Sequence, residues 1–185
     1  MTFSIQIIQE HETQRLQELV STLSPRDDVP PHVLFYLPGL PQPVVMMLEV
    51  SSDQLVRDLL SDFISALAQQ LAAEALVFVA SVWLSQKAGT RPSQAEDRRE
   101  CVWLSIEARG AEGGSLVFEV SRYEHEAPKL ASPTWASTAL TEGRGRFANL
   151  LTRTLADLDP AMVALAEAKA KEIREQISRM KLTTH

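Results

Sequence analysis

Hydrophobic and polar residues alternate along three stretches in the middle of the chain, a pattern typical of β-strands with one apolar face. Residues 100–109 place Ile106 and its apolar neighbours on one side of the backbone and Trp103 on the other. Residues 115–123 alternate in the same way, whereas residues 75–85 are apolar on both sides, as expected inside a sheet. The pattern therefore predicts an antiparallel sheet that contains these strands.

The glycine-rich segment 110–114 joins two of these strands as a hairpin. We expect the register in which the apolar side chains of both strands meet on one face, because a slip by one residue would set them against polar neighbours. The cross-strand pairs expected in this register are Ala108 with Leu116, Ile106 with Phe118, and Leu104 with Val120.

Earlier parts of the chain add strands and helices to this sheet. Apolar stretches at 33–37 and 44–50 are separated by a Pro-Gly-Leu-Pro sequence that suits a tight turn between two strands. Residues 11–23 show the apolar spacing of a helix. A wide apolar stripe over 53–73 predicts a longer helix, which we expect to cover the apolar face of the sheet.

Two more helices are expected near the C-terminus. The first is amphipathic and covers residues 147–158, and Asp159 and Pro160 then form a good start for a helix to about Met180. The narrow apolar stripe of this last helix suits either docking on the protein's own core or a short coiled-coil contact between copies. The residues expected in an oligomer contact are Val163, Ile173, Ile177 and Met180.

These elements predict an α+β fold, with an antiparallel sheet of three to five strands, helices packed on it, and C-terminal helices. The chain has 185 residues, of which 45% are hydrophobic, and this suits one compact core. We expect an α+β domain over residues 1–158 and a C-terminal helix over residues 159–185, either docked or in an oligomer contact.

Charge and cysteine content restrict the partners and the location. The net charge is −6, from 18 basic and 24 acidic side chains, so the chain lacks the basic surface that non-specific nucleic-acid binding needs. The single cysteine, Cys101, excludes an internal disulfide and favours a reducing, cytoplasmic location. The sequence contains neither a signal-peptide pattern nor an uninterrupted apolar run of membrane-spanning length, so we expect no membrane contact.

Catalytic and metal-binding chemistry has little support in the sequence. The histidines have no cysteine or histidine at ligand spacing, so we expect no metal and no cofactor. The strongest enzyme hypothesis places Glu107 diagonal to Glu119 on the outer face of the hairpin, where two carboxylates bind Mg²⁺ in a metal-dependent hydrolase or nuclease. Charged residues on such a face more commonly provide solvation, so we expect no catalytic residue.

Several side chains are candidates for binding. Arg144 and Arg146 alternate with glycines just before a predicted helix, and this arrangement suits either a small anion or nucleotide phosphate, or a solvated helix entry. Trp83 and Trp103 are expected together on the face opposite the main apolar one, covered by late helices or exposed as a contact patch. The polar segment 86–99, which contains Arg91 and Arg98, is long for a loop inside a domain.

This middle region also carries a resemblance. A strand ending near Trp83, a polar link with Arg91-Pro92-Ser93 and Asp97-Arg98-Arg99-Glu100, and a strand beginning at Cys101-Val102 resemble a group of uncharacterised small bacterial and phage proteins of unknown function. The resemblance covers about 40 of the 185 residues and implies only a bacterial or phage origin.

The function that the sequence favours is non-enzymatic. We expect a binding or assembly protein that acts through protein–protein contacts, with itself or with another protein, through its C-terminal helix, the 86–99 segment and the Trp-bearing face. The alternatives are the hydrolase or nuclease with Glu107 and Glu119, and the anion or nucleotide binder with Arg144 and Arg146.

Overall fold

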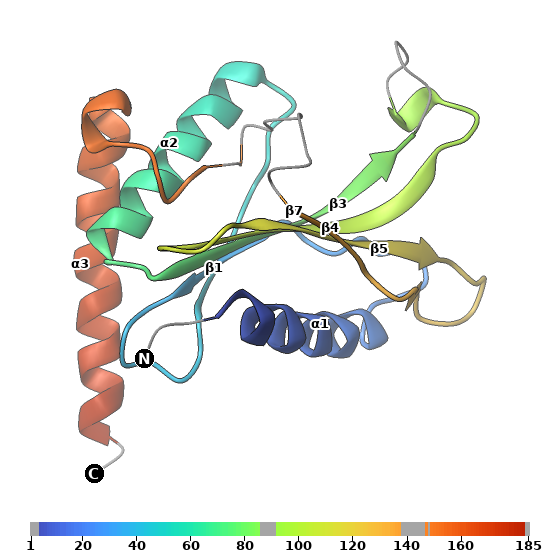
Figure 1. Ribbon diagram of the computed structural model, residues 1–185, viewed down its shortest axis with the longest axis horizontal. Helices are drawn as coiled ribbons and strands as arrows, with labels where there is room; N and C mark the ends of the chain where they lie inside the picture. Colours follow the sequence, from blue (N-terminus) through green and yellow to red (C-terminus); the bar gives the residue numbers. More distant parts are fainter. Residues whose placement is uncertain (1–3, 86–91, 138–146, 148, 184–185) are drawn as a thin grey trace.

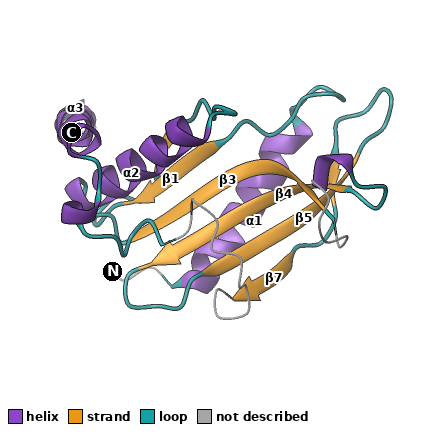
Figure 2. Ribbon diagram, turned by 90° about the horizontal axis from the view of Figure 1, so that it is seen from above, coloured by secondary structure: helices purple, strands orange, loops and turns teal. Residues whose placement is uncertain are grey.

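The computed structural model describes residues 4–85, 92–137, 147 and 149–183 of the chain, and helices lie on both faces of its antiparallel sheet (Figures 1 and 2). Along the chain the elements are α1 (Ile5–Ser21), β1 (His32–Tyr36), β2 (Val44–Met47), α2 (Gln54–Gln70), β3 (Ala75–Leu84), the 3-10 turn η1 (Pro92–Gln94), β4 (Arg99–Ala108), β5 (Gly114–Ser121), β6 (Lys129–Leu130), β7 (Thr134–Ser137), the 3-10 turn η2 (Leu155–Asp157) and α3 (Pro160–Thr183).

The predicted α+β fold with an antiparallel sheet is confirmed. The strand order is β2-β1-β3-β4-β5-β6, and β7 pairs with β5 on the same side as β6. The sheet has seven strands rather than three to five, because the aperiodic segment after Tyr123 adds the short strands β6 and β7. No helix in the described part of the chain combines the length and the apolar character needed to cross a membrane.

One face of the sheet carries the apolar surface of β4 and β5. Ile106 and Phe118 are both fully buried and belong to one cluster, as the alternating pattern predicts. The helix that covers them is α1, whose Ile8 and Leu16 lie in the same cluster. The expectation that the helix after Asp53 covers this face is therefore wrong, and Figure 1 shows α1 and α2 on opposite sides of the sheet.

The helix α2 instead covers the other face, over β1 and β3. Phe35 and Phe78 from these strands join Ile64 and Leu67 of α2 in the second cluster. Because β1 and β3 are apolar on both sides, each face of the sheet can bury a helix. The sheet is therefore the middle layer of three.

The β4–β5 register differs from the expected one by four residues, since Leu104 faces Leu116 rather than Val120. Such an even shift leaves every side chain on its predicted face, so burial alone does not distinguish the two registers. The turn is consequently longer, and it packs closely onto β4: a Cβ atom at Gly113 would lie 2.6 Å from the carbonyl oxygen of Ile106. Gly110 adopts φ +74°, which favours glycine.

The helix α3 docks beside α2. Ala166, Ala170 and Ile173 are buried in the α2-side cluster, and Asp159 caps the helix by accepting hydrogen bonds from the backbone of Ala161 and Met162. The structure therefore has the C-terminal helix in the docked arrangement.

The segment before α3 is not the expected amphipathic helix. Its described part consists of turns and η2, and its apolar residues Leu150 and Leu158 are buried by an irregular path. Polar groups of α2 fix this path, because Ser65 donates to the carbonyl oxygen of Leu150 at 2.8 Å. Side-chain hydrogen bonds thus replace the helical backbone ladder that the apolar spacing indicates.

Candidate functional site

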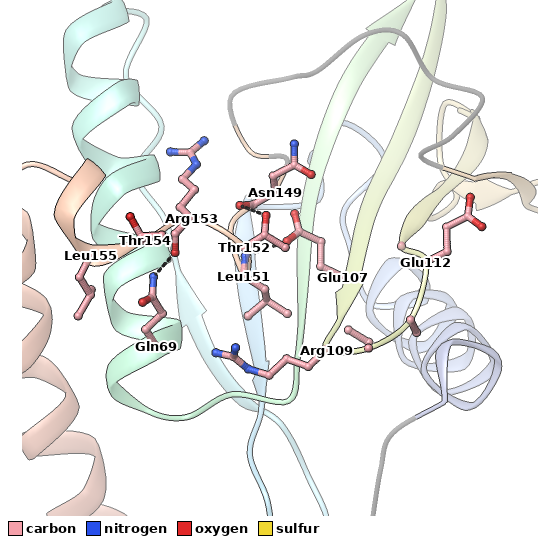
Figure 3. A pocket seen from close by; sticks show the side chains of 14 residues that line it. Gln69, Glu107, Arg109, Glu112, Asn149, Leu151, Thr152, Arg153, Thr154 and Leu155 are labelled. Atoms are coloured by element: carbon pink, nitrogen blue, oxygen red, sulfur yellow. Dashed lines mark hydrogen bonds between the residues drawn. The ribbon is translucent and has the colours of Figure 1, made fainter.

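A cleft with a volume of about 890 Å³ lies between the β4–β5 turn and residues 149–155, with Gln69 of α2 at its side (Figure 3). Its polar lining includes Glu107, Arg109 and Arg153. One of the two carboxylates in the enzyme hypothesis therefore lines this cleft, so its hydrogen bonds decide whether it is available for chemistry.

Glu107 is buried, and both of its carboxylate oxygens accept backbone hydrogen bonds. Oε1 accepts from the amide of Leu150 at 3.0 Å and Oε2 from the amide of Leu151 at 2.9 Å. Burial raises the pKa of Glu107, while the backbone hydrogen bonds of Leu151, Leu150 and Asn149 partly oppose this. Asn149 has φ +59°, so the chain turns sharply here and presents successive amides to the carboxylate. Glu107 therefore holds the turn in place.

The other polar groups around the cleft are also engaged. Gln69 donates to the carbonyl oxygen of Arg153 at 2.7 Å, Arg153 pairs with Asp62 at 3.2 Å, and Arg109 donates through Nε to the carbonyl oxygen of Ala73 at 2.8 Å. Thr154 donates to Asp157. These contacts join α2, the end of β4 and the 149–155 segment. The polar groups that line the cleft thus hold these three parts of the chain together.

The carboxylate pair of the enzyme hypothesis is not formed. Glu119 faces Cys101 across the β4–β5 register, six residues along β4 from Glu107, which corresponds to about 20 Å along the strand. Glu119 is exposed and pairs with Arg99 at 3.4 Å. Within the described residues there is no group of at least three potential metal-ligating side chains. The four-residue difference in register is the reason that the expected diagonal contact is absent.

The two tryptophans also do not meet. Trp103 faces Ala80 across the β3–β4 register, whereas Trp83 faces Glu100, so their side chains lie on opposite faces. Trp103 is partly buried against Phe78, with 5.9 Å between ring centroids. Trp83 is 43% exposed. The prediction that Trp83 and Trp103 share one face is therefore wrong, because the sequence pattern does not determine the register between β3 and β4.

The predicted basic residues are placed only in part. The guanidinium carbon of Arg98 lies 5.5 Å from the centre of the Trp83 ring, in cation–π geometry. Arg91, Arg144 and Arg146 lie outside the described residues. The anion hypothesis at the last two therefore stays a prediction.

A second hollow is apolar and lies between the β1–β2 loop and the C-terminal half of α3, with a volume of about 470 Å³. Three of the predicted contact residues, Ile173, Ile177 and Met180, line it. The fourth, Val163, packs partly buried against the core away from this groove. Sequence reasoning missed the other wall, which includes Leu40, Pro41, Pro43 and Val44. The feature of the sequence that could have indicated this wall is the uncharged segment 38–48.

The strand β2 forms an edge of the sheet next to this groove. Within the described chain, β2 pairs only with β1, and the side chains of Val45 and Met47 are 49% and 59% exposed. The amide of Leu48 donates to the carbonyl oxygen of Pro31 at 2.9 Å, toward β1. Because backbone direction alternates along a strand, Val45 and Met47 point their amide and carbonyl groups outward. We call the groove and this edge together the β2–α3 surface.

A buried polar network fastens α1 to β1. Glu12 is fully buried and accepts hydrogen bonds from Tyr36 and, at 2.7 Å, from Arg15. Arg15 also contacts Nε2 of His32 at 2.8 Å, and Nδ1 of His32 lies 2.7 Å from the carbonyl oxygen of Pro30. This geometry suits a neutral imidazole that donates from Nδ1 and accepts at Nε2. Burial lowers the pKa of His32 and raises that of Tyr36.

This network was not anticipated from the sequence. Its members lie far apart along the chain, and only the packing of α1 on β1 brings them together. Its groups satisfy one another, so it stabilises the fold rather than presenting chemistry to a ligand.

Comparisons of the chain with models of protein families, with curated proteins and with solved structures give no match.

Proposed function

We propose that the protein is a non-enzymatic binding or assembly protein that acts through protein–protein contacts at the β2–α3 surface. The observation that carries the proposal is the coincidence, at one place, of an open strand edge and an apolar groove. Open edges offer backbone hydrogen bonds to another chain, and adjacent grooves select its side chains.

The composition of this surface favours a protein partner. Residues 38–48 carry no charge, although the chain as a whole has a net charge of −6. Natural edge strands are commonly protected from pairing by lysine or other charges, and β2 contains none. Met47 and Met180 are 59% and 62% exposed, so the surface presents flexible apolar side chains that adapt to a partner.

The hydrolase or nuclease alternative is not retained, because Glu107 holds a backbone turn and Glu119 lies far from it.

We propose a cytoplasmic location, which the single cysteine supports. A bacterial or phage origin stays a proposal that rests on the resemblance around Trp83 and Cys101.

The test compares paired variants that differ in place but not in chemistry. Met47→Lys alters the edge and Met180→Asp alters the groove. The controls Ile7→Lys and Leu165→Asp introduce the same charges outside this surface, at side chains that are 60% and 53% exposed. Circular dichroism and thermal unfolding first establish that all four variants fold.

The measurement is binding of any protein partner, by light scattering for self-association and by quantitative affinity capture for other proteins. We expect Met47→Lys and Met180→Asp to weaken the contact about tenfold or more and the matched controls to leave it unchanged. If all four variants bind as the wild-type chain does, or if the wild-type chain binds neither itself nor another protein, the proposed function is wrong.

A further inference from the structure

We propose that the partner at the β2–α3 surface is a second copy of this chain, whose β2 pairs antiparallel with β2 across a twofold axis at Met46. This inference rests on the proposed function and names the partner of the same surface. The contact is isologous, so each copy supplies the same edge, and the two sheets become one continuous sheet.

The backbone of β2 is self-complementary in this register. Val45 and Met47 are the residues whose amide and carbonyl groups point away from β1. With Met46 on the axis, Val45 of each copy faces Met47 of the other. Each facing pair exchanges both of its backbone hydrogen bonds, so every outward amide and carbonyl of β2 obtains a partner.

Pro43 disfavours the neighbouring register that is centred on Val45. If Val45 lay on the axis instead, Met47 would face Pro43 of the second copy. Proline has no amide hydrogen, so that pair would lose one of its hydrogen bonds at each end of the contact. Centring on Met46 keeps both outward pairs complete.

The side chains agree with the same register. On the α1 side of the sheet, the exposed side chains of Val45 and Met47 gather with their copies and leave water. On the α2 side, Met46 faces Met46, and Leu48 of the second copy faces Val44, at the mouth of the apolar groove. All of these contacts are apolar, as expected for cross-strand pairs that stabilise a sheet.

Electrostatics favour this region as the meeting point of two identical chains. Two copies with a net charge of −6 repel each other on average. The run 38–48 carries no charge, so the pairing strands bring no like charges face to face. A second copy is thus accommodated by a strand edge that carries no charged side chain along its length.

The first test is the molar mass of the intact protein by light scattering across a dilution series. We expect the wild-type chain and Ile7→Lys to have twice the chain mass at high concentration and to dissociate on dilution. We expect Met47→Lys to raise the dissociation constant about 100-fold or more, because each interface then contains two added cations beside the strand edge.

The second test fixes the register by disulfide cross-linking. Met46 would form a non-hydrogen-bonded pair with its own copy, with Cα atoms about 4.5 Å apart, within the range that a disulfide spans. Met46→Cys should therefore cross-link at least about tenfold faster than Val45→Cys, whose own copy lies diagonally across the strands. The wild-type chain is the control for Cys101, which is buried.

The outcomes separate the two proposals. A dimer that weakens in Met47→Lys and cross-links through Met46→Cys supports the inference. A wild-type chain that is monomeric at every concentration, yet captures another protein in a manner sensitive to Met47→Lys, overturns the second copy and leaves the proposed function standing. A dimer whose dissociation constant is unchanged by Met47→Lys and that does not cross-link through Met46→Cys overturns the pairing of β2 with β2.

Discussion

Glu107 and His32 occupy environments that differ from those that their positions in the sequence indicate. Alternation placed Glu107 on an outer strand face, where carboxylates are normally solvated, yet the 149–151 backbone covers it and donates to both of its oxygens. His32 begins a strand and is 2% exposed, and its imidazole bridges Arg15 and the carbonyl oxygen of Pro30. The local pattern of apolar and polar residues predicts neither the contacts of Glu107 nor the contact of His32 with Arg15, because these partners are distant in sequence.

Replacement of Glu107 tests its role as a brace. In Glu107→Gln one oxygen becomes an amide that cannot accept, so the amide of Leu150 or Leu151 loses its partner. We expect the free energy of unfolding to fall by about 1–3 kcal/mol in chemical denaturation. Glu119→Gln, which removes an exposed ion pair, should change it by less than about 1 kcal/mol. Equal changes in the free energy of unfolding for the two substitutions would contradict the role of Glu107 in holding the turn.

His32 gives the fold a pH dependence of known sign. Because burial lowers its pKa below 6.5, the unfolded chain binds more protons at this position than the native chain as pH falls through 6.5. The free energy of unfolding should therefore decrease toward acid, by at most about 1.4 kcal/mol per pH unit from this residue. The facing groups Glu12, Arg15, His11 and Tyr36 surround the network that protonation disturbs.

The measurement is chemical denaturation at pH 7.5 and at pH 5.5. Relative to the wild-type chain, His32→Gln should lose part of the difference between the two pH values. A His32→Gln variant with the full wild-type difference would show that another group titrates.

At the level of helices and strands, alternation predicted which side chains share a face, and the structure confirms this for Ile106 and Phe118. It did not predict the register, since an even shift preserves every face. It also did not predict which helix lies on which face, because β1 and β3 are apolar on both sides and α1 and α2 are both amphipathic.

The candidate surface was predictable to the same partial extent. The narrow apolar stripe of α3 identified Ile173, Ile177 and Met180, which line the groove. The facing wall from the β1–β2 loop was not predictable, because proline-rich loops have no periodicity to indicate what they pack against. The expected helix before α3 failed for a related reason: hydrogen bonds from Ser65 and Gln69 override the apolar spacing of that segment.

The placement of α1 leads to a further prediction. Leu16 is fully buried in the cluster with Ile106 and Phe118, so Leu16→Ala should lower the free energy of unfolding by about 2–5 kcal/mol. Ile7→Ala, at a position of the same helix that is 60% exposed, should lower it by less than about 1 kcal/mol. Thermal and urea unfolding give both values. A small effect of Leu16→Ala would mean that α1 does not cover this face.

At the scale of the whole molecule, the three layers bury both faces of the central strands but leave the β2 edge without a described partner. The apolar groove opens beside that edge, so the β2–α3 surface combines exposed apolar side chains with an open strand edge. The proposed assembly through this surface would extend the sheet across the two copies.

Backbone amide hydrogen exchange of β2 at high and low protein concentration tests this account most directly. At high concentration the amides of Val45 and Met47 should exchange at least about tenfold more slowly than on dilution, because they then donate to a second copy. The amide of Met46, which points toward β1, is the internal control and should not change. Exchange at Val45 and Met47 that is equally fast at both concentrations would contradict the account.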